Sequence, residues 1–280
     1  MTSIIDTHVH LWDPGRLPYP WLGDIPVLNR PYGLGEYRQA CGGHDVTRMV
    51  FVQCDTPRTL EEAAWVSELA KEDPRLAAIV AGAAIEKGEA VLPDLEQLVR
   101  YPLVRGVRRL IQSEPMPGFC TQPNFIAGLK LLPRFNFSFD ICIKHHQLGD
   151  VIDMVRQCPQ VTFILDHIAK PDIAKQLFEP WRRQIRELAG LPNVWCKVSG
   201  MVTEADYQKW TAADLKPYVE HVLDCFGADR VMFGGDWPVV ALASPLHRWI
   251  DTLKDLISAC SMAEQTKLFH DNARRCYRLA

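Results

Sequence analysis

Eight apolar runs of strand length, spread along the whole chain, constrain the fold more than any other feature of this sequence. Turn residues bound each run, and successive runs begin 24 to 45 residues apart. These intervals are too long for hairpins and suit a parallel strand, a crossover helix and two loops. The runs are Ile4–Asp6, Met49–Cys54, Leu76–Ile85, Val104–Leu110, Phe137–Ile143, Val161–Leu165, Val194–Val198 and Val231–Gly234.

Helical patterns fill most of the intervals between these runs. Thr59 and Glu62 have the spacing of a capping box, which predicts a helix from there through Lys71. A last helix is expected after Asn272. None of the eight runs alternates apolar with polar residues, which is typical of strands covered on both faces. Apolar residues at helical spacing predict further helices within 92–99, 151–155, 215–226 and 253–257.

Eight strand–helix units in 280 residues predict an α/β fold, a (β/α)8 TIM barrel that forms a single domain over residues 1–280. The alternative is an open doubly wound sheet. That fold usually carries a glycine-rich phosphate-binding turn after its first strand, and this chain has none. No internal repeat, low-complexity tract or Gly/Ser linker marks a second domain.

Charge and composition exclude several classes of protein. The chain has 31 Lys+Arg against 34 Asp+Glu, a formal net charge of −3, so we expect no nucleic-acid partner. No apolar run reaches the ~18 residues of a membrane span, and the first residues do not form a secretion signal. The nine cysteines are dispersed with no C-x-x-C pair, which predicts a reduced, cytoplasmic protein rather than a disulfide scaffold.

Two histidines just after the first run form a candidate metal site. His8 and His10 are separated by one residue, so in an extended segment both point to the same face. Imidazole ligands suit zinc, iron, nickel and similar ions. Active sites of barrels lie where the strands end at their carboxyl side, and these histidines are at such an end. The alternative is a pair of exposed turn histidines.

Two more strand ends carry candidate catalytic groups. His167 follows the sixth run and is either a pocket residue or a core histidine bonded to backbone, while Asp166 either orients it or caps a turn. Asp236 follows two glycines, and Pro238 ends the strand behind it. A carboxylate at the barrel mouth can bind a metal and take a proton from water. The alternative for Asp236 is a turn aspartate that bonds its own backbone.

The fourth run ends in two adjacent arginines. Arg108 and Arg109 must face opposite ways, so one should point into the barrel and the other toward the helices. An inward arginine there is a partner for a carboxylate or an oxyanion. Gln112 and Glu114 follow in the loop. Glu114 is a metal ligand, a substrate contact or a solvated charge.

Polar and aromatic residues at two further places are expected near the pocket. Lys144 follows the fifth run, and of the next two residues, His145 and His146, at most one should enter the site because neighbours on a strand diverge. In the long loop 11–35, aromatic residues either form a wall of the pocket or plug the barrel mouth. These residues are Trp12, Tyr19 and Trp21.

Taken together, the histidines, the aspartate and their flanking motifs resemble the amidohydrolase superfamily, closest to its sugar-lactone hydrolases: L-fuconolactonases, L-rhamnonolactonases and pyrone-dicarboxylate hydrolases. H-x-H alone is common, but H-x-H-x-W with the later DHIAKP and GGDWPV is specific. The resembling segments are IIDTHVHLWDP (4–14), YPWL (19–22), GVRRLIQSEP (106–115), FDICIKHHQL (139–148), LDHIAKP (165–171), CKVSGM (196–201), GGDWPV (234–239) and HDNARRCYRL (270–279).

The resemblance implies a distorted (β/α)8 barrel, acting in carbohydrate metabolism, that opens cyclic carboxylate esters with water. The positions that form the centre of the site in the superfamily map to His8, His10, His167 and Asp236. This chain departs from the two-metal members on its fourth and fifth strands, where no bridging Lys or Glu and no unambiguous His ligand stands. The expectation is therefore one divalent metal ion, with zinc favoured, or none.

The expected mechanism assigns a role to each candidate. Asp236 is the general base toward water, and His167 holds the oxyanion or protonates the leaving oxygen. A metal held by His8, His10 and Asp236, with Glu114 as a further candidate ligand, polarises the carbonyl. The expected substrate contacts are Arg108, Arg109, Gln112, Lys144 and Trp12.

Two other functions stay open. A metal-dependent, non-oxidative decarboxylase of the same superfamily shares H-x-H, the sixth-strand histidine and the eighth-strand aspartate, and a non-catalytic sugar-acid binding protein would keep the aromatics and the arginine. The expected partner is a small sugar lactone, with no membrane. The identity of the sugar, the ring size and the oligomeric state are open, a homo-oligomer being one alternative.

Overall fold

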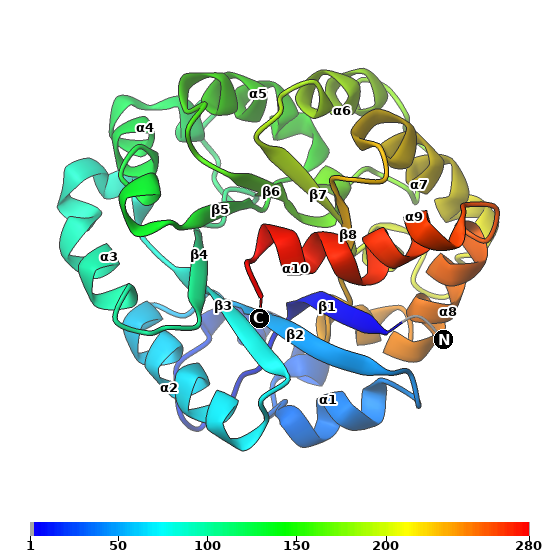
Figure 1. Cartoon of the computed structure of the whole chain (residues 1–280), viewed down its shortest axis with the longest axis horizontal. Coiled ribbons are helices and arrows are strands. Elements are labelled where there is room, and N and C mark those ends of the chain that lie inside the picture. Colours follow the sequence, from blue (N-terminus) through cyan, green and yellow to red (C-terminus); the bar gives the residue numbers. More distant parts are fainter. Residues whose placement is uncertain (1–2, 280) are drawn as a thin grey trace.

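The computed structural model describes residues 3–279 and contains one eight-stranded parallel sheet (Figure 1). The strands are hydrogen-bonded in chain order, β1 to β8, as expected for a barrel built from successive strand–helix units. The predicted α/β barrel is confirmed. The strands are β1 (Ile4–Val9), β2 (Val46–Val52), β3 (Leu76–Gly82), β4 (Val104–Arg108), β5 (Ser138–Ile141), β6 (Phe163–Leu165), β7 (Val194–Val198) and β8 (Val231–Phe233).

The seam between β8 and β1 distorts the barrel. The two strands share no continuous ladder, and a single parallel bridge joins Val9 to Trp237. Among the described residues, backbone hydrogen bonds close the seam only near the carboxyl ends, from His10 N–H to Trp237 O (2.7 Å) and from Asp236 N–H to His8 O (2.8 Å). The seam therefore closes at the place where the candidate histidines meet Asp236.

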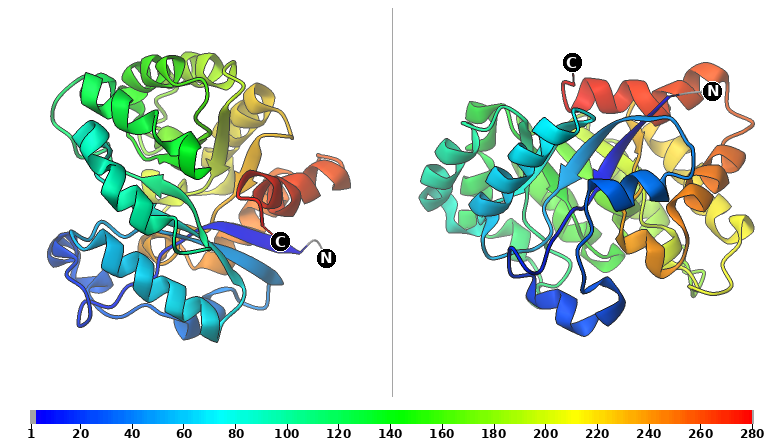
Figure 2. Two further views of the ribbon diagram at one scale, coloured as in Figure 1. Left: turned by 60° about the vertical axis from the view of Figure 1, so that its left-hand side comes forward. Right: turned by 90° about the horizontal axis from the view of Figure 1, so that it is seen from below.

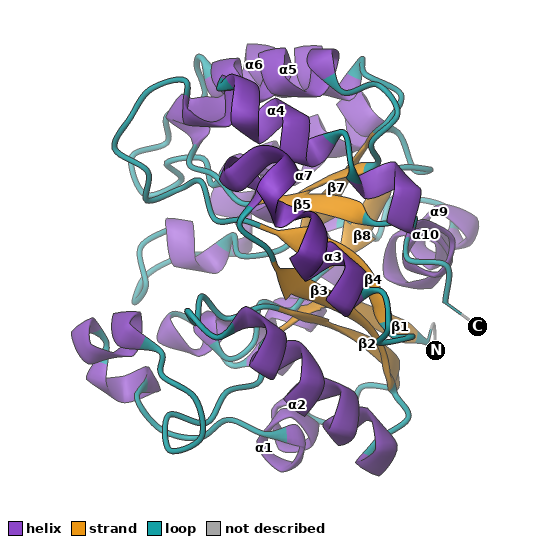
Figure 3. Ribbon diagram, turned by 90° about the vertical axis from the view of Figure 1, so that its left-hand side faces the viewer, coloured by secondary structure: helices purple, strands orange, loops and turns teal. Residues whose placement is uncertain are grey.

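Helices surround the strands on the outside (Figure 3). Their buried faces supply most of the core between helices and sheet, with fully buried residues such as Val66, Leu95 and Ile185. No helix within residues 3–279 combines the length and the hydropathy needed to cross a membrane. The helices are α1 (Leu34–Ala40), α2 (Thr59–Glu72), α3 (Leu92–Leu98), α4 (Pro123–Leu129), α5 (Leu148–Gln157), α6 (Trp181–Ala189), α7 (Ala212–Phe226), α8 (Leu246–Leu256), α9 (Met262–Thr266) and α10 (Asn272–Cys276).

The predicted helix at Thr59 is confirmed, but the capping box that suggested it is wrong. The residue before the helix is Arg58, and no side chain caps that end. Glu62 turns inward and is 1% exposed. The two oxygens of its carboxyl group accept the Cys54 N–H at 3.2 and 3.3 Å. The Cys54 N–H, just after β2, has no partner in the sheet and is buried. It therefore binds the Glu62 side chain, which the sequence pattern had assigned to the start of the helix.

The helix α10 closes one end of the barrel. Its residues and those just after it pack against side chains that the strands direct into the barrel, including Val50, Val80 and Met232. Figure 1 shows α10 crossing the ring of strands, on the side where both termini lie. The loop after β1, with short 3₁₀ turns at Pro20–Asp24 and Pro26–Leu28, lies at the opposite end (Figure 2, right). The open mouth of the barrel is therefore at the carboxyl ends of the strands.

Candidate active site

Three imidazoles and one carboxylate converge at the barrel mouth. The Nε2 atoms of His8, His10 and His167 lie 3.8, 3.6 and 3.8 Å from Oδ1 of Asp236. The Nε2 atoms of His8 and His10 are 3.2 Å apart. All four residues are buried, with at most 6% of their surface exposed. Residues from the first, sixth and eighth strand ends thus meet at one point.

Glycines before Asp236 let the eighth strand end approach the first. A Cβ at Gly235 would lie 2.3 Å from Oδ2 of Asp6, which no ordinary contact allows. Instead the Gly235 N–H donates to Oδ1 of Asp6 at 2.7 Å, and the His8 N–H donates to the same oxygen at 3.0 Å. Burial raises the pKa of Asp6 to about 6, although these donors and the Tyr37 hydroxyl oppose the shift. Asp6 therefore fixes the two strand ends that carry the cluster.

A left-handed turn presents the sixth-strand histidine. Residues His167, Ile168, Ala169 and Lys170 have φ values of 54, 48, 65 and 47°. Non-glycine residues adopt this region at a cost of roughly 1–2 kcal/mol each, so the surrounding packing must hold the turn. The indole N–H of Trp181 donates to Ile168 O at 2.8 Å and anchors the turn from outside.

The second ring nitrogen of each histidine has a fixed partner. His10 Nδ1 lies 2.7 Å from Val52 O, and because a carbonyl can only accept, Nδ1 carries the proton and Nε2 the lone pair. His167 Nδ1 is 2.9 Å from the Ser199 hydroxyl oxygen. Burial lowers the pKa of His8, His10 and His167, so the three rings are neutral. Neutral, oriented imidazoles are what a divalent metal ion requires.

A buried charge network lies beneath the cluster. Lys197 Nζ is 2.5 Å from Oδ2 of Asp140 and 2.9 Å from Oδ1 of Asp166. The other Asp166 oxygen pairs with Arg108 Nη1 at 3.0 Å, and Asp166 Oδ1 is 3.3 Å from His8 Nδ1. From the far end of the barrel, the Tyr277 hydroxyl donates to Oδ2 of Asp140 at 2.9 Å. Asp166 thus supports His8, and neither of the two roles predicted for it is observed.

A cavity of about 260 Å³ opens above the cluster; we call it the reaction cavity. Trp12 and Trp21 form one side, as one of the two predictions for the first loop had it, whereas Tyr19 is buried and does not line the cavity. On another side, Lys170 Nζ donates to Oε1 of Gln112 at 2.6 Å. The full lining is His10, Trp12, Trp21, Ile25, Cys54, Asp55, Arg108, Leu110, Gln112, Ser113, Cys142, His167, Lys170, Asp236 and Val239.

Of the two arginines at the end of β4, only Arg108 enters the barrel. Its side chain is 4% exposed, while Arg109 points to the helix layer and pairs with Glu86 at 2.9 Å. Arg109 also pairs with Glu114 at 2.5 Å. Glu114 therefore forms an ion pair with Arg109 and does not approach the histidines. The structure does not bring Arg109 or Glu114 into the reaction cavity.

The residues after β5 also lie outside this cavity. Lys144 is exposed, and His145 Nδ1 sits 3.1 Å from Lys170 O. His146 lines a separate hollow beside α5. Cys142, two residues before Lys144, is the residue of this segment that faces the reaction cavity. The strand ends earlier than the apolar run suggested, so the residues in line with the cavity come earlier as well.

Comparison with known proteins decides the family. The sequence profile described as amidohydrolase matches residues 5–279. The chain belongs to the amidohydrolase family. This amidohydrolase is 32% identical over 296 aligned positions to a protein of Burkholderia multivorans named L-fucono-1,5-lactonase, covering 98% of this chain and 96% of the relative. It is 22% identical to an L-rhamnono-gamma-lactonase of Scheffersomyces stipitis, covering 99% of both chains.

A solved structure supports the same placement. An amidohydrolase crystal structure from Burkholderia multivorans with bound zinc superposes with a TM-score of 0.91 at 30% identity, covering 99% of this chain and 100% of that one. The resemblance inferred from the motifs is therefore confirmed at the level of the family.

The cluster of this amidohydrolase fits a divalent metal ion by its donor set. His8, His10 and Asp236 offer ligand atoms that all lie within 4.8 Å of one another, and so do His8, Asp166 and His167. The Nε2–Nε2 separation of 3.2 Å between His8 and His10 suits two ligands of one ion, because zinc–nitrogen bonds are ~2.0–2.1 Å long. Imidazole with carboxylate is a common zinc ligand combination.

Proposed function

We propose that this amidohydrolase opens the internal ester of a sugar-acid lactone of the L-fuconolactone type with water, and that Asp236 is the general base. One observation carries the proposal: an ionised carboxylate faces three neutral imidazoles at the floor of a small cavity. The names of the relatives, L-fucono-1,5-lactonase and L-rhamnono-gamma-lactonase, support a lactone as the substrate class.

Asp236 is suited to accept a proton from water. Burial would raise its pKa, but the polar and charged groups around it, the Lys170 ammonium among them, outweigh burial and lower the pKa, so the carboxylate is ionised at neutral pH. In the proposed reaction a water oxygen bonds to the lactone carbonyl carbon while its proton passes to Asp236. The ring C–O bond then breaks, and Asp236 returns the proton to the leaving oxygen. The product carboxylic acid releases one proton to solvent.

Cationic and polar side chains of the reaction cavity are placed to stabilise the oxyanion and hold the substrate. Burial disfavours the charged forms of Arg108 and Lys170, but neighbouring acidic groups outweigh it and raise both pKa values. Both side chains therefore stay cationic in the cavity. Charge-assisted donors that already point at a developing oxyanion commonly contribute about 10²–10³ in rate each. Gln112, held by Lys170, adds an amide for the sugar hydroxyls.

A metal ion has a defined place in this proposal. His8, His10 and Asp236 would hold one divalent ion, with zinc favoured, and His167 lies close enough to join them. When bound, such an ion polarises the carbonyl and lowers the pKa of water. The neutral state of the three imidazoles supports this assignment.

Trp12 offers an apolar face to the carbon side of the sugar ring, and its indole N–H is already held by Leu28 O at 3.2 Å and Arg30 O at 3.0 Å. The ring is therefore rigid before substrate arrives. We further propose that residues 1–280 act as one domain in the cytoplasm, alone or as a homo-oligomer, with neither nucleic acid nor membrane as a partner.

A panel of sugar-acid lactones, followed with a colour pH indicator, tests the proposed function. We expect acid release from L-fucono-1,5-lactone or a close stereoisomer, measured after metal removal and again with zinc or manganese added. A panel of hydroxybenzoic acids in the same plate, followed by loss of their ultraviolet absorbance, tests the decarboxylase alternative. Turnover of a hydroxybenzoate with no lactone opened would overturn the proposal.

A further inference from the structure

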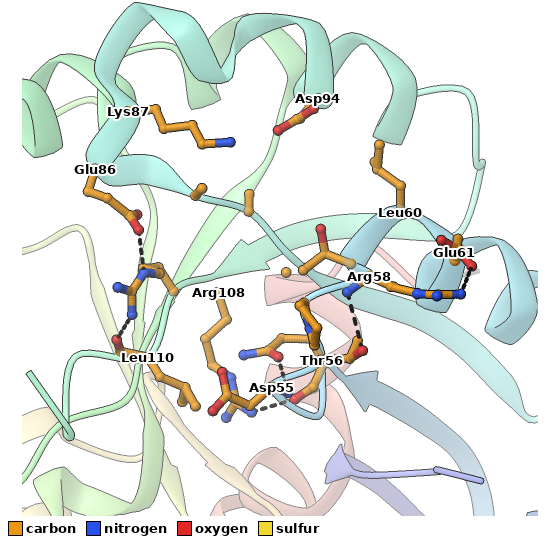
Figure 4. A pocket seen from close by; sticks show the side chains of 17 residues that line it. Asp55, Thr56, Arg58, Leu60, Glu61, Glu86, Lys87, Asp94, Arg108 and Leu110 are labelled. Atoms are coloured by element: carbon orange, nitrogen blue, oxygen red, sulfur yellow. Dashed lines mark hydrogen bonds and ion pairs between the residues drawn. The ribbon is translucent and has the colours of Figure 1, made fainter. Parts of the chain in front are cut away.

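A second cavity, which we call the side cavity, adjoins the reaction cavity at the same end of the barrel. Its volume is about 600 Å³, against about 260 Å³ for the reaction cavity. It lies between the carboxyl ends of β2, β3 and β4 and the start of α2 (Figure 4). Asp55, Arg108 and Leu110 line both cavities, so the two cavities meet at these residues. A substrate bound over the cluster would therefore lie next to the side cavity.

The side cavity is strongly polar but balanced in charge. Four basic side chains line it: Arg58, Lys87, Arg108 and Arg109. Four acidic side chains oppose them: Asp55, Glu61, Glu86 and Asp94.

Several polar groups of the side cavity lack partners. Within residues 3–279, Lys87 and Asp94 form no ion pair, and Figure 4 shows both side chains reaching into the cavity from the segments before and within α3. Oε2 of Glu86 is buried without a hydrogen-bond partner, and so is Nε of Arg108, whose side chain is 4% exposed. Lys87 is exposed and Asp94 is half-buried, so both charged groups are available to a polar ligand in the side cavity.

The balance of charge indicates what that ligand is. A phosphate or carboxylate would meet four acidic side chains, and an apolar group would desolvate the charged lining without pairing with it. A hydroxyl donates to a carboxylate and accepts from an ammonium or guanidinium group, so a neutral ligand with several hydroxyls matches alternating acids and bases. A sugar residue is such a ligand, and the volume accommodates one.

We propose that the side cavity is a subsite for a neutral sugar residue attached to the lactone, so that the substrates of this enzyme include aldonolactones with a glycosyl substituent. The inference rests on the proposed lactonase function, and it assigns to the side cavity the part of the substrate that takes no part in ring opening. Lys87, Asp94 and Glu86 would bind its hydroxyls.

The test compares a simple lactone with its glycosylated form. D-glucono-1,5-lactone and its 4-O-galactosyl derivative, lactobiono-1,5-lactone, are assayed with the wild type, Lys87→Met and Asp94→Asn. We expect the wild type to have the lower KM for lactobiono-1,5-lactone. Each variant should raise that KM about tenfold, because one hydrogen bond to a charged group is lost, and should leave the KM for the simple lactone unchanged.

Matched variants outside the cavity serve as controls. Lys71→Met on the exposed face of α2 and Asp153→Asn on the exposed face of α5 remove the same groups elsewhere and should change neither KM. Simple lactones opened at full rate, with lactobiono-1,5-lactone bound no better than glucono-1,5-lactone, would overturn the subsite and leave the proposed function standing.

If no lactone is opened at all, the proposed function fails and binding decides the subsite separately. Ligand-observed NMR then compares lactobionate with gluconate. Binding of lactobionate alone, lost in Lys87→Met and kept in Lys71→Met, would support the side cavity as a sugar site. Equal binding of both acids, or none, would overturn it.

Discussion

At the scale of single residues, Asp236 combines two properties that rarely occur together. It is 4% exposed, and its pKa is nevertheless lowered, because burial is outweighed by the polar and charged groups around it, Lys170 among them. Its backbone has a φ of 55°, in the left-handed region that few non-glycine residues adopt. A residue held in this way is positioned by the whole mouth of the barrel rather than by its own strand.

Replacing this carboxylate tests its role directly. We expect Asp236→Asn to lower kcat/KM for the best lactone by about 10²–10⁴-fold, the range for loss of a general base. Circular dichroism and the unfolding midpoint check that the variant is folded. Asp255→Asn on the exposed end of α8 is the matched control and should keep the wild-type rate. An Asp236→Asn enzyme within about tenfold of wild type would rule out this base.

Glu62 gives a second prediction, on stability. Burial raises its pKa from 4.5 to about 8, so between these pH values the folded protein keeps a proton that the unfolded chain loses. The free energy of unfolding of the wild type should therefore fall as pH rises through this window, by on the order of 1.4 kcal/mol for each pH step of one. Glu62→Gln has no such proton to lose, so its stability should gain on that of the wild type across the same window.

Urea unfolding across this pH range measures the difference. Glu61→Gln is the control, because Glu61 precedes Glu62 in the helix but its side chain is 60% exposed. Its stability should follow the wild-type pH curve. Parallel curves for the wild type and Glu62→Gln would mean that Glu62 is ionised in the folded protein.

Strand-end position explains which site residues could be read from the sequence. His8 and His10 share a face because they are two apart in an extended segment, and Asp236 is marked by its glycines. Which of two adjacent arginines enters the barrel depends on strand register, which local sequence does not specify. Lys197 was missed because it sits inside an apolar run, VWCKV; a lone lysine in a buried strand is itself a signal of a buried partner.

At the scale of elements, the turn after β6 depends on a neighbour from β7. Gly200 has a φ of +58°, and a Cβ there would lie 2.5 Å from His167 Nδ1. The glycine therefore gives the imidazole the room in which it reaches Ser199. Neither the left-handed run from His167 to Lys170 nor this contact has a signature in the local sequence, since β-branched and cationic residues at such φ values are held only by tertiary packing.

Gly200→Ala should displace the imidazole of His167. We expect kcat/KM to fall by about 10²-fold, the effect of a misplacement of an ångström at a reacting centre. Gly227→Ala is the matched control, because Gly227 has a φ of +66° and no atom within 4 Å of an added Cβ. Both variants should lose similar stability from backbone strain, of about 1–2 kcal/mol, but only Gly200→Ala should lose activity. Equal activity in both variants would contradict the proposed contact.

At the scale of the whole molecule, the barrel brings together side chains that lie far apart in the sequence, such as those of His8 and Asp236. The order of elements and their spacing were sufficient to predict this fold, because parallel strands with crossover helices leave few topologies. The sequence did not indicate the side cavity, which depends on how far α2 and α3 stand from the strand ends.

Metal binding should stabilise the whole fold, because the ligands come together only when the barrel is closed. With zinc at about 100 times its Kd, the gain is about 2.7 kcal/mol, so we expect the Tm of the metal-free wild type to rise by about 5 °C or more. His8→Ala and His10→Ala should show no rise and no zinc by elemental analysis. His146→Ala, outside the reaction cavity, should respond like the wild type. If the Tm of the metal-free wild type did not change when zinc was added, the proposed metal site would be contradicted.

The residues of α10 and just after it, which close one end of the barrel, are the last part of the fold to be synthesised. A ribosome releases all eight strands before Tyr277, yet the Tyr277 hydroxyl holds Asp140, which in turn holds Lys197 under Asp166 and His8. A nascent polypeptide that has not reached Tyr277 therefore has all the residues of the candidate site but lacks the hydroxyl that holds Asp140 beneath them. We expect the buried network under the site to be complete only after the last residues of the chain have been added.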